Sequence, residues 1–170
     1  MKRLFFALWP DESTRAKIDQ LNQSLFCKHL KKVRPDNLHV TLAFMGRVDE
    51  KTERAIRLSM SDISAEPITL FFDQLTSWSD ASVLCLTSSK QPQQIIALVE
   101  QLKVVIGDYG IEIDSRPYTA HVTLARKAQP NPTIMLTPIC WDAMNFALVE
   151  SVSTSRGVNY RVLESWPLNL

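Results

Sequence analysis

One tetrapeptide, His-Val-Thr-Leu, occurs twice in this chain of 170 residues, at 39–42 and at 121–124, a separation of 82 positions (121 minus 39). The two copies contain two of the chain's three histidines. The match extends outward: an Arg-Pro pair stands five and four residues before each histidine and an alanine follows each leucine, so seven of eleven aligned positions agree. Such a duplication predicts two similar halves of structure, each presenting the same short strand.

Each copy has the residue types of a β-strand, because Val and Thr favour a pleated backbone. Successive side chains of a strand point to opposite faces. His39 and Thr41 are therefore expected to share one face, about 6.6 Å apart along the strand, while the two apolar residues of the motif point into a core. The same alternation places His121 and Thr123 together. We expect a polar face with one imidazole and one hydroxyl to be formed twice.

Two imidazoles that face each other can act at neutral pH as an acid and a base, one protonated and one neutral. Threonine hydroxyls beside them can donate hydrogen bonds to the oxygens of a phosphoryl group in transfer. A single His-x-Thr is more often an ordinary polar pair, but packing does not require exposed polar positions to be kept in both copies. The repeat therefore predicts a metal-free phosphoryl-transfer site formed by His39, Thr41, His121 and Thr123.

Two His-x-Thr motifs in a chain of this length resemble the two-histidine (2H) phosphoesterase superfamily and, within it, the bacterial RNA 2',3'-cyclic phosphodiesterases, also called 2'-5' RNA ligases. The resemblance covers nearly the whole chain and is carried by residues 3–7 (RLFFA), 37–46 (NLHVTLAFMG), 116–126 (RPYTAHVTLAR), 148–151 (LVES), Tyr160 and 166–168 (WPL). The chain departs from the family at Ala120, where proline is common, and at Arg47, where an acidic residue is common. Both departures concern loops expected to shape the rim of the site.

The resemblance implies that His39 is the proton donor and His121 the proton acceptor, a choice that the symmetric motifs alone leave open. It also implies substrate contacts by Arg126, two residues beyond the second motif's leucine, and by Phe44, at the corresponding place in the first. Arg126 could neutralise the phosphate or stack on the base. Phe44 could stack on the terminal base, although strict alternation turns it away from the polar face and is nearly as consistent with a core role. Tyr118 is a further candidate for lining the site.

The net charge of the chain limits the kind of substrate that it can bind. A net charge of +1 and a pI near 7.7 give no broad basic surface for long duplexes, so a substrate held at one phosphate is expected. The three scattered cysteines favour neither a disulfide framework nor a zinc site, and indicate reduced thiols in the cytoplasm. No segment approaches the roughly 20 apolar residues of a membrane span. We expect a cytoplasmic monomer without metal or cofactor. The resemblance implies that it acts on RNA with a 2',3'-cyclic phosphate end, such as a tRNA fragment.

Local signals predict strands at 4–9, 39–42, 68–72, 82–87, 121–124, 144–150 and 160–164, and helices at 11–28, 49–61 and 92–110. Strands 68–72 and 82–87 are expected to pair with each other through a turn at 77–80, and 151–159 is expected to be a polar connection. Prolines at 130, 132 and 138 indicate an extended loop. The third histidine, His29, lies in a basic segment and is interpreted as part of a solvated helix end.

The irregular order of strands and helices favours an α+β fold with antiparallel sheets over a doubly wound parallel sheet. The repeat, supported by the resemblance, predicts one domain over residues 1–170. We expect it to consist of two pseudo-symmetric lobes of antiparallel sheet with helices packed outside and the active-site cleft between them.

Three other functions fit parts of the pattern. The same chemistry could act on a small cyclic phosphate such as ADP-ribose cyclic phosphate. A non-catalytic module that binds RNA ends would use the same residues without proton transfer, so His39→Asn would leave its function intact. A metallohydrolase is disfavoured by the lack of an acidic cluster near either motif. A metallohydrolase would lose activity in the presence of a chelator, whereas an enzyme with the two-histidine mechanism would keep it.

Overall fold

The computed structural model describes residues 1–25, 30–127 and 136–169. Within these ranges the chain forms three α-helices, two short 3-10 helices and ten strands. The helices are α1 (Glu12–Ser24), α2 (Glu50–Ser59) and α3 (Gln93–Asp108). The strands are β1 (Lys2–Leu8), β2 (Lys31–Lys32), β3 (Val40–Val48), β4 (Ile68–Phe72), β5 (Gln74–Trp78), β6 (Val83–Thr87), β7 (His121–Arg126), β8 (Ile139–Ala143), β9 (Asn145–Thr154) and β10 (Gly157–Pro167). This composition confirms the predicted α+β class.

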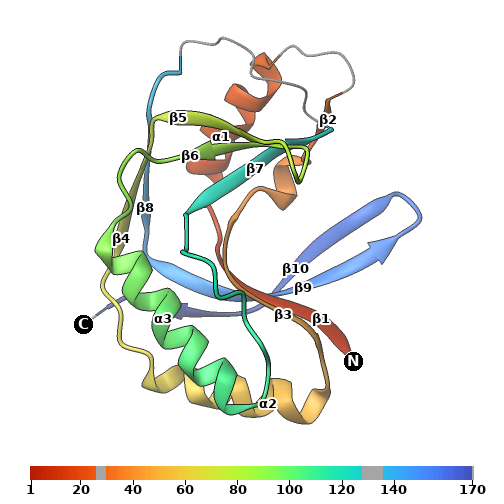
Figure 1. Ribbon diagram of the computed structural model, residues 1–170, viewed down its shortest axis with the longest axis vertical. Helices are drawn as coiled ribbons and strands as arrows, with labels where there is room; N and C mark the ends of the chain where they lie inside the picture. Colours follow the sequence, from red (N-terminus) through yellow and green to blue (C-terminus); the bar gives the residue numbers. More distant parts are fainter. Residues whose placement is uncertain (26–29, 128–135, 170) are drawn as a thin grey trace.

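Eight strands form one sheet in the order β10-β9-β1-β3-β7-β6-β5, with β2 paired to β7, and every pairing is antiparallel. The two strands that carry the repeated tetrapeptide, β3 and β7, are neighbours in the middle of this order. They are joined at a single residue pair, Val40 with Val122. The sheet therefore has two halves that meet at the motif strands (Figure 1).

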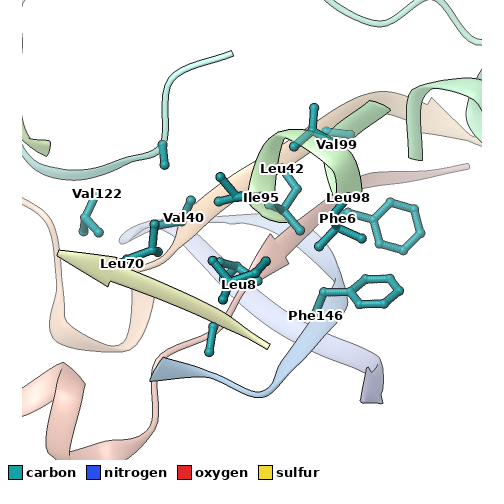
Figure 2. Packing of buried hydrophobic residues seen from close by; sticks show 14 of the residues in the cluster. Phe6, Leu8, Val40, Leu42, Leu70, Ile95, Leu98, Val99, Val122 and Phe146 are labelled. Carbon is teal, nitrogen blue, oxygen red and sulfur yellow. The ribbon is translucent and has the colours of Figure 1, made fainter. Parts of the chain in front are cut away.

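The main hydrophobic core lies on one face of β1 and β3. Figure 2 shows Phe6 and Leu8 of β1 and Val40 and Leu42 of β3 close to Ile95, Leu98 and Val99 of α3, and all of these side chains are buried. A buried side chain of this size contributes about 1.5–3 kcal/mol relative to an exposed one. The apolar residues of both motifs point into this core, as the alternation predicted.

A smaller apolar cluster lies on the opposite face of β1 and β9. Its buried members are Phe5, Ala7, Ala147 and Val149, with Trp9 and Tyr160 packed against them. β1 is thus covered on both faces, which explains why it reads as a continuous apolar run rather than an alternating one. His39, directly before β3, lies on this second face, with its ring beside that of Phe5.

The helix starts follow the capping signals of the sequence. The Asp11 carboxylate accepts a hydrogen bond from the backbone N–H of Thr14 at 2.7 Å, and the Asp49 carboxylate accepts one from that of Thr52 at 2.9 Å. Pro92 stands directly before α3, and Gly110, at φ +74°, follows its end. The first helix ends at Ser24, earlier than the predicted end, and residues 26–29, with His29, lie outside the described residues.

The predicted pairing of strands 68–72 and 82–87 is wrong. β4 instead pairs with β8 in a separate two-stranded sheet, while β6 pairs with β5 and β7. Part of residues 74–78 has the composition of a turn, but these residues form the strand β5. Residues 139–143 form the short strand β8, which the sequence did not predict. Because β8 pairs with β4, about seventy residues earlier, no local signal indicates this pairing.

The predicted polar connection at 151–159 is also wrong, because β9 and β10 continue through it as one long hairpin that turns at residues 155–156. Its outer part is exposed and lacks the alternation by which strands are recognised. Figure 1 shows this hairpin projecting beyond the rest of the sheet. Most of the expected loop at 130–138 falls among residues that the structure does not describe. In the described part of the chain no helix is long and apolar enough to span a membrane.

Candidate active site

The pairing of Val40 with Val122 fixes how the two motifs meet. In antiparallel neighbours, the residues on either side of such a pair lie on the sheet face opposite to the pair itself. The valines point into the core, so His39 and Thr41 share the other face with His121 and Thr123. The two histidines occupy diagonal positions, for which residues are about 7–8 Å apart and their Cβ atoms somewhat closer. The structure thus brings together the four residues predicted from the repeat.

A β-bulge interrupts each motif strand at the same place. In the pairing of β3 with β1, Ala43 lies opposite Phe6 and Thr41 opposite Ala7, so Leu42 is an extra residue. In the pairing of β7 with β6, Leu124 is extra in the same way, because its neighbours on both sides pair with consecutive residues of β6. A bulge shifts the alternation by one position. Both motif leucines therefore reset which face the following side chains occupy.

The bulges bring Phe44 and Arg126, each five residues after its motif histidine, to the face of the site. Phe44 lies opposite Phe5, on the same face as Thr41, and is 45% exposed. The core role that strict alternation allowed for Phe44 is thus wrong. The guanidinium carbon of Arg3 lies 5.0 Å from the centre of the Phe44 ring. Arg126 is exposed and lines the pocket that contains His39.

Both imidazoles are held by the same backbone contact. Nδ1 of His39 lies 2.6 Å from the carbonyl oxygen of Asn37, and Nδ1 of His121 lies 2.8 Å from that of Thr119. A carbonyl oxygen only accepts hydrogen bonds, so Nδ1 carries the proton in each ring. Nε2 is therefore the nitrogen of each histidine that remains available to exchange a proton with a ligand.

Aromatic rings surround His39. Trp9 stacks on its ring at 5.5 Å, and Phe5 and Tyr160 lie with ring centres at 5.1 and 5.0 Å. This burial lowers the pKa of His39 from 6.5 to about 4, an effect that the Asn37 carbonyl opposes and that the charge of His121 increases. Burial likewise lowers the pKa of His121, whose ring contacts Trp78 edge to face at 4.7 Å. Both imidazoles are therefore neutral at pH 7 in the free protein, whereas the sequence predicted one of them to be protonated.

The two motif threonines differ in their partners. The hydroxyl oxygen of Thr41 lies 3.0 Å from Nε2 of His39, within hydrogen-bond distance. The hydroxyl oxygen of Thr123 lies 3.8 Å from the sulfur of Cys85, a weak contact to a buried thiol whose pKa burial raises to about 11. The repeated sequence thus produces an asymmetric pair, in which the first histidine and threonine are directly linked.

Tyr118 connects the two halves of the sheet. Its hydroxyl donates a hydrogen bond of 2.9 Å to the backbone carbonyl of Thr41, and burial raises its pKa. The residue precedes β7 by three positions and reaches across to β3, beside the single pair that joins the strands. Its ring lines the pocket that contains His121, as expected for a residue near the site, while its hydroxyl is engaged with the backbone.

Two pockets open on this face, one beside each histidine. A pocket of about 200 Å³ contains His39 and is also lined by Arg3, Arg126, Ser151 and Tyr160, among others. A pocket of about 720 Å³ contains His121 and is also lined by Trp78, Arg116 and Tyr118. Thr41 and Phe44 line both pockets. The point at which the pockets meet is therefore the face of β3 between the two histidines.

The architecture and sequence match known proteins over nearly their whole length. The profile of the 2'-5' RNA ligase superfamily matches residues 9–152. The chain belongs to this superfamily. The RNA 2',3'-cyclic phosphodiesterase of Escherichia coli strain K12 is 30% identical, over 98% of this chain and 97% of its own length. The RNA 2',3'-cyclic phosphodiesterase of Archaeoglobus fulgidus is 24% identical, over 95% of this chain and 97% of its own length. The crystal structure of E. coli LigT in apo form is similar to this structure with a TM-score of 0.90 at 29% identity, and the similarity covers 99% of this chain and 98% of the LigT chain. For the crystal structure of E. coli LigT complexed with 3'-AMP the TM-score is 0.88.

Membership of the 2'-5' RNA ligase superfamily agrees with the resemblance seen in the two motifs, and the LigT-like fold accounts for the antiparallel architecture.

Several residues around the histidines were not predicted as members of the site: Arg3, Phe5, Trp9, Trp78 and Tyr160. Phe5 lies in the continuous apolar run of β1, where periodicity gives no signal, and Tyr160 lies on β10, a mostly exposed strand at the edge of the sheet. Trp78 lies where the sequence indicated only a polar turn. In the described ranges no group of three His, Cys, Asp or Glu side chains is arranged to hold a metal ion.

The lowered pKa of His39 predicts a loss of stability in acid. Between pH 6.5 and about 4 the unfolded chain binds a proton at this imidazole that the folded protein does not, so the free energy of unfolding falls as pH decreases through this window. At about 1.4 kcal/mol per pKa unit, the loss reaches at most about 3–4 kcal/mol. Urea unfolding of the wild type and of His39→Gln at pH 7, 6, 5 and 4 measures it. The wild type should lose stability relative to the variant over this range, and parallel curves would contradict the assigned shift.

Proposed function

We propose that this chain hydrolyses RNA 2',3'-cyclic phosphate ends to 2'-phosphate ends by acid–base catalysis between His39 and His121. The observation that carries the proposal is the placement of both imidazoles on one face beside a single strand pair, each with Nδ1 bound to a carbonyl and Nε2 available. The similarity to RNA 2',3'-cyclic phosphodiesterases over nearly the full length supports the substrate class.

In the proposed reaction His121 takes a proton from water as the water oxygen attacks phosphorus, and His39 gives a proton to the departing 3' oxygen. Attack and departure lie roughly in line, so the two nitrogens should flank the phosphorus about 6–9 Å apart, given hydrogen-bond reach on each side. The diagonal placement of the two residues on neighbouring strands is consistent with this span. The 2'-phosphate and a free 3'-hydroxyl are the products.

Binding of the substrate would supply the proton that His39 needs. In the free protein burial lowers the pKa of His39 to about 4, which leaves it neutral at pH 7. A phosphate anion beside the ring favours the charged form and raises this pKa. Once Nε2 carries the proton that it gives to the 3' oxygen, it no longer accepts a hydrogen bond from Thr41, whose hydroxyl proton can then turn toward a non-bridging oxygen. Donor and oxygen ligand are thus prepared together when the anion arrives.

We assign the other oxygen contact to Thr123 and the nucleotide contacts to Arg126, Phe44 and Tyr118. Arg126 and Arg3 give the pocket beside His39 two positive charges, suited to a phosphate. Phe44 is exposed enough to stack on a base. Tyr118 contributes its ring to the wall of the other pocket, and its hydroxyl holds the carbonyl of Thr41 in place.

The two halves of the sheet act in this proposal as two lobes of one domain over residues 1–170, with helices outside and the reaction cleft between them. One motif strand comes from each half, and the pockets on either side share only the face around Thr41 and Phe44. Both imidazoles belong to the same chain, so a monomer contains the complete site. By microscopic reversibility the same groups can join a cyclic phosphate end to a 5'-hydroxyl.

The proposal is tested by incubating the protein with an oligonucleotide that ends in a 2',3'-cyclic phosphate and identifying the position of the phosphate in the product. We expect a 2'-phosphate, at a rate that EDTA leaves unchanged, because acid and base are both side chains. ADP-ribose cyclic phosphate serves as the comparison substrate. Loss of turnover in EDTA, a 3'-phosphate product, or binding of the RNA end without turnover would contradict the proposed function.

A further inference from the structure

Asn37 ties the segment before β3 to the outer edge of β10. The residue ends a short 3-10 helix, Pro35–Asn37. Its side-chain Nδ2 donates a hydrogen bond of 2.8 Å to the backbone carbonyl of Val158, and its Oδ1 accepts one of 3.2 Å from the backbone N–H of Tyr160. β10 stands at the end of the strand order, so among the described strands only β9 pairs with it. The side-chain amide of Asn37 therefore takes the place that the backbone of a neighbouring strand would occupy.

The backbone of the same residue holds the imidazole of His39. The carbonyl oxygen of Asn37 lies 2.6 Å from Nδ1 of His39. Because this carbonyl and the side-chain amide belong to one residue, the two bonds to β10 restrict where the carbonyl can lie. Burial lowers the pKa of His39, and the carbonyl opposes this effect because it stabilises the protonated ring. The β9–β10 hairpin, which projects from the sheet in Figure 1, is thus linked to the proposed proton donor.

The second copy of the motif is built differently at this position. Thr119 stands two residues before His121, as Asn37 does before His39, and its carbonyl oxygen lies 2.8 Å from Nδ1 of the second ring. The Thr119 side chain is exposed, and it carries a single hydroxyl in place of the paired donor and acceptor of an amide. The two imidazoles therefore have the same backbone contact but different support behind it.

The arginines of the two Arg-Pro pairs show the same difference. Nη1 of Arg34 donates a hydrogen bond of 2.7 Å to Oδ1 of Asn159 on β10, 125 residues later in the chain. Arg116, its counterpart in the second copy, binds Asp114, only two residues away, with its Nε at 2.9 and 3.0 Å from the two carboxylate oxygens. The segment before the first motif is thus fastened to a distant strand at residues 34 and 37, whereas the arginine before the second motif is bound locally.

We infer that Asn37 is a positioning residue for the proton donor: by binding the edge of β10 it holds His39, and not His121, in the orientation that delivers a proton. This inference rests on the proposed function. A general acid must lie within about 2.6–3.2 Å of the oxygen that it protonates, and a misplacement of about 1 Å can cost on the order of 10²-fold in rate. Aromatic rings still enclose His39 when the amide is removed, so the loss should be smaller than for removal of the imidazole itself.

The test compares the wild type with Asn37→Ala and with Asn37→Thr, which places the residue of the second copy in the first. On an oligonucleotide that ends in a 2',3'-cyclic phosphate we expect kcat to fall at least about tenfold in both variants, with little change in KM. The second substrate is a nucleoside phosphodiester with a p-nitrophenol leaving group, which departs without a proton. On this ester we expect both variants to stay close to the wild-type rate.

The matched control is Gln101→Ala. The amide of Gln101 makes the same pair of bonds as that of Asn37, to the backbone oxygen and nitrogen of Ser64 at 2.8 and 3.2 Å, but it lies outside the pockets beside the histidines. Its removal should leave the rates on both substrates unchanged.

Nitrogen NMR shifts of the imidazoles provide a readout that a general loss of stability would not produce. They distinguish a ring nitrogen that carries a proton from one that does not. In the free wild type the proton of His39 lies on Nδ1. In both Asn37 variants we expect the His39 signals to move toward the form protonated at Nε2, whereas the signals of His121 should keep their wild-type positions.

Three results would overturn the inference and leave the proposed function standing. The first is a wild-type kcat on the cyclic phosphate in both folded variants of Asn37. The second is an equal loss on the two substrates, which would assign the amide to support of the whole site. The third is a set of His39 signals identical to those of the wild type. A wild type without turnover of the cyclic phosphate would overturn both the inference and the proposed function.

Discussion

Replacement of either motif histidine by alanine should lower kcat for a 2',3'-cyclic phosphate end by about 10²–10⁴, the range that a positioned general acid or base contributes. Each imidazole is a separate proton carrier, held through its own backbone carbonyl, so neither can substitute for the other. KM should change much less than kcat, because the arginines that line the pocket beside His39 remain. Single-turnover rates of His39→Ala and His121→Ala measure the effect. The control is His29→Ala, which removes the histidine that belongs to neither motif.

A second substrate separates the two roles. A nucleoside phosphodiester with a p-nitrophenol leaving group needs no proton on departure, so a missing donor should matter little. We expect His39→Ala to recover most of its lost rate on this ester and His121→Ala to remain impaired. The reverse pattern would exchange the donor and acceptor assignments. Equal activity of both variants and the wild type on the cyclic phosphate would remove the two-histidine mechanism altogether.

Thr41→Val should lower kcat by about 10²–10³, the usual cost of removing one donor to a developing oxyanion. Valine keeps the shape of threonine and its strand preference, so the loss isolates the hydroxyl. The effect has a second cause, because the same hydroxyl lies 3.0 Å from Nε2 of His39. Thr41→Ser keeps the hydroxyl and should retain most of the activity. Thr123→Val should also be impaired but should leave the titration of His39 unchanged, since its hydroxyl contacts Cys85 instead.

The imidazole signals of His39 in NMR spectra provide the readout that distinguishes these variants. In Thr41→Val the midpoint of His39 should move, whereas in Thr123→Val it should stay near the wild-type value. The control is Thr69→Val on β4, whose hydroxyl donates to Asp142 in the separate two-stranded sheet. A Thr41→Val variant with wild-type kcat would exclude this hydroxyl from contact with the reacting oxygens.

The sequence predicted the local structure well wherever one signal decides it. The capping aspartates at 11 and 49 and the proline at 92 set the starts of the three helices. The order of strands in the sheet could not be predicted in this way. β4 pairs with β8 across about seventy residues, and the choice between that partner and β6 depends on how the whole core packs. The projecting part of the β9–β10 hairpin was missed because it is held mainly by ladder hydrogen bonds and not by an alternating apolar face.

Among the site residues, those inside the repeat could be predicted, because the two copies can be aligned with each other and share the same polar positions. His39, Thr41, His121 and Thr123 fall on one face as alternation requires. Phe44 could not be placed correctly, since a one-residue bulge is invisible to a rule of strict alternation. The aromatic enclosure of His39 and the ring of Trp78 come from segments outside the repeat. The low pKa of His39 follows from that enclosure and was therefore also missed.

The extra residues at Leu42 and Leu124 separate the packing of the core from the orientation of the side chain two positions later. In a regular strand, both would depend on the same alternation. Each leucine is buried, and the side chain two positions later faces the site, with its backbone paired to β1 at position 44 and to β6 at position 126. Positions 44 and 126 can thus be exchanged for other residue types while the packed interior stays as it is. They are the natural places at which a lineage, or an engineer, could retune nucleobase preference without refolding the catalytic frame.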